Sequence, residues 1–82
     1  MFYAYIIVSS KDGSFYKGHT ENLEERLEQH NSGKTKSIKH LTPFEMAYYE
    51  TFSTREEAIK REKYFKTAAG RRFIKFKLNL HT

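Results

Sequence analysis

The segment Tyr3–Val8 constrains the fold most, because it is rich in β-forming residues and apolar on both faces. A strand of that kind has to be covered on both sides, so the segment is predicted to be a central strand of a sheet. Asp12-Gly13 is a turn signal. Ser14–His19 is therefore expected to return as the second strand of an antiparallel hairpin.

A helix is predicted after this hairpin. Asn22 can cap its first turn, and Glu25 stands at the reciprocal position of a capping box. The helix is expected to run to about His30, with Gly33 suited to its end. Residues 34–42 are polar and basic, and are predicted to form a loop.

The second half of the chain has a strand followed by two helices. Pro43 precedes a third strand at Phe44–Phe52, a position that tolerates proline. Ser53–Glu56 matches a second capping box, which would start a helix to about Lys66. Gly70 is expected to break that pattern before a last helix. Four side chains of the last helix are predicted to face inward: Phe73, Ile74, Phe76 and Leu78.

The predicted order is thus β-β-α-β-α-α, an α+β fold in which about three helices flank a three-stranded antiparallel sheet. The length of 82 residues suits one domain, residues 1–82. Without cysteine, disulfides, thiolate zinc sites and cysteine catalysis are excluded. Neither a bilayer-spanning run of about 20 apolar residues nor a basic leader is present, so no membrane association and a cytoplasmic location are expected.

Basic charge concentrates in the second half of the chain. The formal net charge is +5, and Lys60 to Lys77 contains eight basic residues and a single acid, Glu62. Such a stripe suits a polyanion such as nucleic acid. Solubility alone is the alternative explanation for this charge.

Two polar side chains of the first predicted helix do not lie on its acidic outer face. On a wheel of about 100° per residue, Arg26 and His30 are one turn apart and flank Leu23 and Leu27. They are candidates for a site. A long arginine at the edge of the core and a hydrogen-bonded core histidine are the structural alternative.

Glu62 stands out on the second helix, because it falls within about 40° of Ala58, inside the apolar stripe that also holds Phe65. A carboxylate there is costly unless a cation or hydrogen-bond donors meet it. It could pair internally, with Arg26 or with a lysine of the last helix. It could also hold Mg²⁺, together with waters and phosphate oxygens.

The two predicted hairpin strands carry weaker signals. Tyr16 shares a strand face with Gly18, and a glycine within a strand often marks the close approach of a ligand or another backbone. Tyr5 lies on the adjacent strand. The run from Tyr16 to His19, just before a helix, is thus a plausible edge of a site.

Together these residues resemble the GIY-YIG nuclease superfamily over nearly the whole chain. Tyr3-Ala4-Tyr5 and Tyr16-Lys17-Gly18 stand at the two triplets, Arg26 follows Tyr16 by ten residues, and His30 follows Arg26 by four. Glu57-Ala58 with Glu62 is similar to the EA-xxx-E pattern of the family. The chain looks like its small stand-alone members, which are relatives of an excinuclease N-terminal nuclease domain and of intron homing endonuclease catalytic domains.

The sequence departs from the pattern of this superfamily at a few positions. Tyr3 replaces the Gly of the first triplet and Lys17 the Ile of the second, and His19 stands where some relatives have Lys. Many larger members have an Asn downstream of the metal-binding Glu, and none occurs between Glu62 and Arg72. The fold is not put in doubt by these differences.

The resemblance implies a mechanism. Glu62 would hold one Mg²⁺ or Mn²⁺ ion against the scissile phosphate. Tyr16, or His30, would act as general base on the attacking water, and Tyr5 would position the water or the base. Arg26 would stabilise the pentavalent transition state, since its planar fork suits phosphate oxygens.

The expected activity is endonucleolytic hydrolysis of DNA or, less readily, RNA, in repair, recombination or restriction-like processing. A nucleic-acid-binding module that has lost turnover is the rival. A protein partner could supply specificity, and the oligomeric state is left open. The residues expected to contact nucleic acid are Lys17, His19, Lys34, Lys36, Lys66, Arg71 and Arg72.

Overall fold

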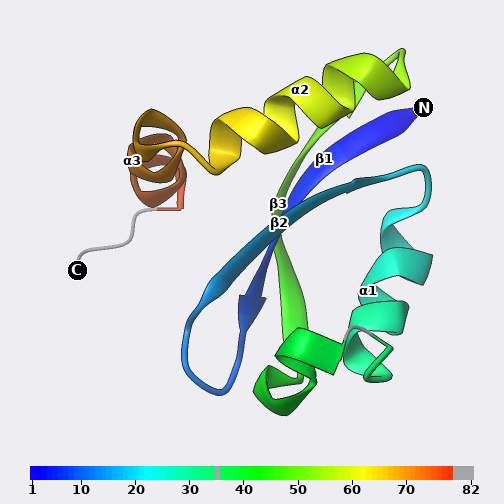
Figure 1. The fold of residues 1–82 in the computed structure, drawn as a ribbon, viewed down its shortest axis with the longest axis vertical. Coiled ribbons are helices and arrows are strands. Elements are labelled where there is room, and N and C mark those ends of the chain that lie inside the picture. The colour runs from blue at the N-terminus through cyan, green and yellow to red at the C-terminus, as the bar shows by residue number, and fades with distance from the viewer. Residues whose placement is uncertain (35, 79–82) are drawn as a thin grey trace.

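The computed structural model describes residues 1–34 and 36–78. In chain order the elements are β1 (Phe2–Ser9), β2 (Phe15–Thr20), α1 (Leu23–Asn31), the 3₁₀ helix η1 (Lys36–Leu41), β3 (Phe44–Phe52), α2 (Arg55–Phe65) and α3 (Ala68–Lys77) (Figure 1). The strands form an antiparallel sheet in the order β2-β1-β3. The predicted α+β fold and the central position of β1 are confirmed. The segment expected to be a loop contains η1.

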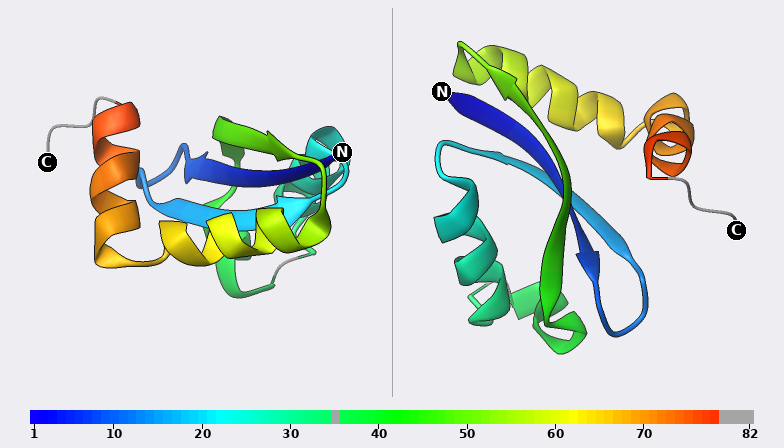
Figure 2. Two further views of the ribbon diagram at one scale, coloured as in Figure 1. Left: turned by 90° about the horizontal axis from the view of Figure 1, so that it is seen from above. Right: turned by 180° about the vertical axis from the view of Figure 1, so that it is seen from behind.

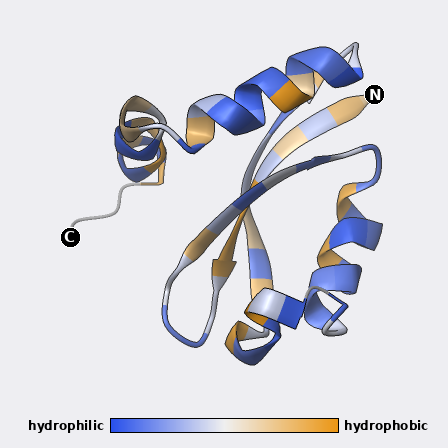
Figure 3. Cartoon of the chain, viewed as in Figure 1, coloured by the Kyte–Doolittle hydropathy of each residue, from blue (hydrophilic) through white to orange (hydrophobic). Residues whose placement is uncertain are grey.

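Helices cover both faces of the sheet because β1 is apolar on both faces (Figure 2). On one face, β1 joins α2 and α3 through Ala4, Ile6, Phe65 and Ile74. On the other face it joins η1 and β3 through Tyr5, Ile7, Ile38 and Phe44, with the leucines of α1 packed against them. Figure 3 shows α1 and α2 as mostly hydrophilic ribbons with a few hydrophobic positions.

The first helix follows its local sequence signals. The Asn22 side chain accepts a hydrogen bond from the Glu25 backbone N–H at 3.0 Å, which caps α1. Gly33 follows the helix with a φ of 83°, the left-handed conformation expected of its end. No helix of the described residues is long and apolar enough to cross a membrane.

The start of α2 lies one residue later than the capping box at Ser53–Glu56 predicts. Thr54 is the cap, and its hydroxyl accepts from the Glu57 backbone N–H and donates to the Glu57 carboxylate at 2.9 Å. Both frames of this Ser-Thr-Arg-Glu-Glu run satisfy the same capping pattern. The local sequence therefore could not distinguish them.

Two expectations for α3 are wrong. Gly70 does not break the helix but lies within its first turn, where the Thr67 hydroxyl accepts its backbone N–H at 3.0 Å. A Cβ at Gly70 would overlap the Tyr64 carbonyl oxygen, so the glycine permits the tight junction of α2 and α3. Phe76, expected to face inward, is 85% exposed, whereas Ile74 is buried.

Candidate active site at the edge of the sheet

The glycine of β2 makes room for a tyrosine of β1. Tyr5 and Gly18 are directly opposite in the antiparallel register, and Ile7 is opposite Tyr16, so both tyrosines lie on the face covered by α1. A Cβ at Gly18 would lie 2.6 Å from Cζ of Tyr5 and even closer to its hydroxyl oxygen. Gly18 therefore marks the close approach of the Tyr5 ring, rather than of a ligand or a second backbone.

The Tyr5 hydroxyl connects two residues of α1. It accepts a hydrogen bond from Nε of Arg26 at 3.2 Å and lies 2.9 Å from Nε2 of His30. Burial raises the pKa of Tyr5, and the hydrogen bond and charge of Arg26 offset only part of this increase. The phenol therefore keeps its proton. Burial and then the Arg26 charge lower the pKa of His30, so its ring is neutral at pH 7. The phenol proton can thus be donated to His30 Nε2.

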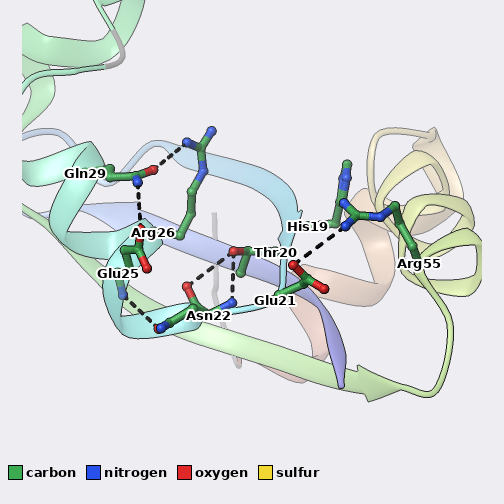
Figure 4. A pocket seen from close by; sticks show the side chains of 8 residues that line it. All are labelled: His19, Thr20, Glu21, Asn22, Glu25, Arg26, Gln29 and Arg55. Atoms are coloured by element: carbon green, nitrogen blue, oxygen red, sulfur yellow. Dashed lines mark hydrogen bonds and ion pairs between the residues drawn. The ribbon is translucent and has the colours of Figure 1, made fainter.

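Arg26 is held at a second point by its own helix. Its Nη1 donates to the Gln29 side-chain oxygen at 3.0 Å, and the Gln29 amide in turn donates to Glu25 at 3.4 Å (Figure 4). With Nε on Tyr5 and Nη1 on Gln29, the plane of the guanidinium is fixed. A fork oriented in this way is suited to a phosphate.

Glu62 reaches the same region from α2. Its Oε1 lies 2.5 Å from Nδ1 of His19 on β2, and its Oε2 accepts from Nζ of Lys66 at 2.9 Å. Burial by itself would raise the pKa of Glu62, but the hydrogen bonds and charges of His19 and Lys66 outweigh it and hold the pKa below its ordinary value. The carboxylate is ionised and faces two cationic or polar donors.

One pocket of about 320 Å³ collects these side chains. Its lining comprises Tyr5, Tyr16, Lys17, Gly18, His19, Arg26, His30, Ser37, Ile38 and Glu62. The five residues proposed for catalysis and metal binding therefore meet on one concave surface. Tyr5 belongs to the α1 side of the sheet, whereas His19, opposite Ala4 in the register, belongs to the α2 side. The pocket thus straddles β2, the edge strand.

Tyr16 occupies the pocket differently from Tyr5. Its ring packs edge-on against Phe44, with the centroids 5.6 Å apart, and it is only partly buried. Among the described residues its hydroxyl has no hydrogen-bond partner, whereas the Tyr5 hydroxyl is engaged twice. A group entering the pocket could therefore bind the Tyr16 hydroxyl without displacing a protein contact.

The basic residues expected to bind nucleic acid divide into two groups. Lys17 and His19 line the pocket, and the pKa of Lys17 is lowered by burial and by the nearby charges of Arg71 and Lys66. These residues form one positive region beside Glu62. Lys66 and Arg71 belong to this region but, like Lys34, Lys36 and Arg72, are exposed and do not line the pocket.

Some contacts of the site were not foreseen. Gln29 follows Arg26 by three residues on α1, so helical spacing was an available signal for their contact. His19 was expected among the contacts to nucleic acid, and its pairing with Glu62 was not predicted. No local pattern could reveal that pair, because 43 residues separate its two members. The internal partners considered for Glu62, Arg26 and a lysine of the last helix, are not the observed ones.

Comparisons with known proteins show a domain family that matches this chain and several similar proteins. The sequence-family model of the GIY-YIG catalytic domain matches residues 1–79 of this chain. A UPF0213 protein of Bacillus licheniformis is 44% identical over 63 residues, 76% of this chain and 65% of that protein, so the chain spans less than two thirds of that relative. A UPF0213 protein of Staphylococcus saprophyticus is 40% identical over 84% of this chain and 85% of its own length. The solution structure of a UPF0213 protein of Bacillus halodurans matches with a TM-score of 0.55 and 32% identity, over 98% of this chain and 86% of the other.

Proposed function

Because the chain belongs to the GIY-YIG catalytic domain family, whose members are generally nucleases, we propose that it is a divalent-metal-dependent endonuclease acting on DNA. One observation carries this proposal. Tyr5, Tyr16, Arg26, His30 and Glu62 come from four elements and line a single pocket at the edge of the sheet. Together they offer a carboxylate for a cation, a donor fork for a phosphate and phenol or imidazole groups for proton transfer.

Glu62 is the residue that would hold the metal ion. Its side chain is 17% exposed, and it is ionised beside His19 and Lys66, so its surroundings already accommodate positive charge. Carboxylate oxygens suit Mg²⁺ and Mn²⁺, and a single protein carboxylate often suffices when substrate phosphate completes the shell. The ion, when bound, supplies Lewis-acid polarisation of the phosphate and stabilises the leaving oxygen.

Arg26 would stabilise the charge that develops on the phosphate. Its contacts to Tyr5 and Gln29 use Nε and Nη1. Among the described residues no further contact of the guanidinium occurs, so its remaining N–H groups are left for phosphate oxygens. Because the side chain is already oriented, little reorganisation is needed when charge builds up in the transition state.

Tyr16 is the better candidate for the general base. His30 is only 5% exposed, and its Nε2 faces the Tyr5 hydroxyl rather than open space. In this arrangement His30 and Arg26 fix the position of Tyr5, and Tyr5 supports the base or the water. As a phenolate, Tyr16 would accept a proton from the attacking water, since among the described residues its oxygen has no protein partner to displace.

DNA would lie across β2, with its backbone against the positive region of Lys17, Lys66 and Arg71. Burial lowers the pKa of Lys17, and the nearby positive charges of Arg71 and Lys66 lower it further. An approaching phosphate would relieve that repulsion. Exposed Lys34, Lys36 and Arg72 could extend the contact, and His19 would lie at its centre.

The test is cleavage of nicked, branched and single-stranded DNA with Mg²⁺, with Mn²⁺ and with chelator. We expect metal-dependent cleavage that Glu62→Gln and Arg26→Lys each reduce by about 10²-fold or more, as loss of a transition-state donor does in other enzymes. Glu56→Gln is the matched control, because it removes the same charge from an exposed position of α2 outside the pocket. It should cleave as the wild type does.

The alternative is a nucleic-acid-binding module without turnover, and the pairing of both Glu62 oxygens with His19 and Lys66 is the observation that favours it. Wild type and Glu62→Gln would then bind DNA with similar affinity and both lack cleavage. In either case, Lys17→Ala should reduce the slope of the logarithm of DNA affinity against the logarithm of salt concentration by about 1, the amount expected for one lost phosphate contact. Lys11→Ala, an exposed charge in the β1–β2 turn, serves as its control.

A further inference from the structure

Glu62 does not face the pocket alone, because an imidazole nitrogen points at the same oxygen that would bind a metal ion. Nδ1 of His19 lies 2.5 Å from Oε1 of Glu62. Both side chains are partly buried, at 32% and 17% exposure, and both line the proposed active pocket. They come from β2 and α2, elements whose positions are set by the packed core, so the two donor atoms are held together by the fold.

A nitrogen and an oxygen donor side by side form a pair that one metal ion can bridge. Metal bonds of about 2.1 Å to each donor place the two donors roughly 3 Å apart, so a small separation of the two side chains would admit an ion. Histidine binds metals through either ring nitrogen, and the nitrogen that faces Glu62 is the one that would bind. The ion would replace the direct contact between the two side chains.

The other partner of Glu62 does not oppose this arrangement. Lys66 Nζ contacts Oε2, the second carboxylate oxygen, and its side chain is 57% exposed. Because the Lys66 side chain is mostly exposed at the C-terminal end of α2, it can turn to solvent or to a phosphate when a cation binds Glu62. His19, by contrast, is held in the pocket.

The metal-ligating atoms, one nitrogen and one oxygen, determine which metal ion the site prefers. Mg²⁺ prefers oxygen ligands, whereas imidazole suits first-row transition ions such as Mn²⁺, Co²⁺ and Zn²⁺. Affinity for an N,O site also rises along the series from Mn²⁺ to Co²⁺. A site with His19 should therefore discriminate between Mg²⁺ and transition ions more strongly than Glu62 alone would.

We propose that His19 is a second ligand of the ion held by Glu62, bound through Nδ1, and that the site consequently takes a transition ion such as Mn²⁺ or Co²⁺ in preference to Mg²⁺. This inference rests on the proposed function only in placing an ion at Glu62. It assigns His19 a role beyond the contact with nucleic acid, and it adds a prediction about selectivity that the carboxylate alone does not make.

The experiment measures binding of the metal salts alone to the purified protein, by calorimetry for Mg²⁺, Mn²⁺ and Co²⁺. His19→Gln should lower the Mn²⁺ and Co²⁺ affinities about tenfold or more, the range that loss of even an outer partner of a metal site costs. The Mg²⁺ affinity should change less than about twofold, since Mg²⁺ seeks oxygen ligands. Exposed His40→Gln on η1, outside the pocket, is the matched control and should change none of them.

A spectroscopic signature separates ligation from a structural role. With Co²⁺ bound, the proton NMR spectrum of the wild type should contain a hyperfine-shifted, exchangeable imidazole N–H resonance that His19→Gln lacks and His40→Gln retains. If Glu62→Gln abolishes binding while His19→Gln leaves the affinities and the shifted resonance unchanged, the role of His19 is refuted and the metal site at Glu62 stands. If Glu62→Gln binds every ion as the wild type does, the metal site at Glu62 is wrong, and the role of His19 is wrong with it.

Discussion

Replacing Gly18 by alanine tests the geometry on which the candidate site depends. The added Cβ would lie 2.6 Å from Cζ and 2.9 Å from Cε2 of Tyr5, both well inside van der Waals contact. The ring has little freedom to move aside, because Tyr5 is 2% exposed and its hydroxyl is held between Arg26 and His30. Either the strands separate or the phenol leaves its two partners.

The magnitude follows from those two alternatives. Overpacking a filled site by one methyl group costs about 1–3 kcal/mol. Weakening of the Tyr5 hydrogen bonds, one buried and one part-buried, adds about 1 kcal/mol. We therefore expect Gly18→Ala to destabilise the protein by about 2–4 kcal/mol, against a total of roughly 4–12 kcal/mol for a chain of 82 residues.

The assay is urea denaturation of Gly18→Ala, Tyr5→Leu and the double variant. If the clash with the ring is the cause, Gly18→Ala should cost less than about 1 kcal/mol once Tyr5 is leucine, which leaves a coupling energy of at least about 1 kcal/mol. Gly13→Ala is the control. Its φ of 77° makes alanine unfavourable, but nothing lies within 4 Å of the added Cβ, so its effect should be independent of Tyr5.

A neutral or stabilising Gly18→Ala would refute this reasoning, since alanine would then fit beside the ring. An equal cost of Gly18→Ala in the wild-type and Tyr5→Leu backgrounds would refute it as well. The cause would then be the backbone of β2 rather than the phenol. In the active-site proposal the same substitution should also reduce cleavage, because Tyr5 would no longer orient Arg26.

Two further predictions concern the pH dependence of stability. Burial by itself would raise the pKa of Glu50, but hydrogen bonds from Arg61 Nε at 2.7 Å and from the Tyr48 hydroxyl at 2.6 Å hold the pKa below its ordinary value. Glu50→Gln should therefore cost about 1–3 kcal/mol at pH 7, and less at pH 2, where the carboxylate is protonated to a greater extent, measured by urea denaturation. An equal cost at both pH values would contradict this. His30 has a pKa lowered by burial and by Arg26, so the unfolded chain takes up its proton first, and stability should fall as the pH drops below 6.5. His30→Gln should reduce that fall between pH 7.5 and 5.5, whereas His40→Gln should not, and identical slopes for wild type and His30→Gln would exclude the assignment.

The local features of the fold were predictable because their causes are local. Asn22 caps α1 with its own neighbour, and Gly33 supplies a conformation that other residues avoid. The apolar composition of β1 on both faces required cover on both faces, which placed it in the centre of the sheet. The segment with two overlapping caps, Ser53 and Thr54, was the one where local signals were equivalent and the start of α2 was misplaced.

Helical periodicity also predicted where several side chains of the candidate site lie. Arg26 and His30 were expected on one side of α1, and both contact the Tyr5 hydroxyl. Glu62 was expected on the inner side of α2 with a positive partner, and it meets His19 and Lys66. The same kind of reasoning failed for Phe76, because α3 packs on the sheet through only part of its surface, and a wheel does not say how wide that part is.

The sequence by itself determined the helices and strands and the central position of β1. It also identified the polar side chains, such as Glu62, that lie on an inner face and therefore need a partner. Only the tertiary structure decided which of these side chains contact one another. It showed that Gly18 is small because Tyr5 lies over it, and that Glu62 pairs with His19 rather than with Arg26. The physical reason is that α1 and α2 lie on opposite faces of the sheet, and their polar side chains can meet only where the edge strand β2 ends the sheet. The central position of β1 makes β2 an edge strand, but no spacing along the chain encodes that side chains of α1 and α2 both reach that edge, and their meeting there forms the pocket.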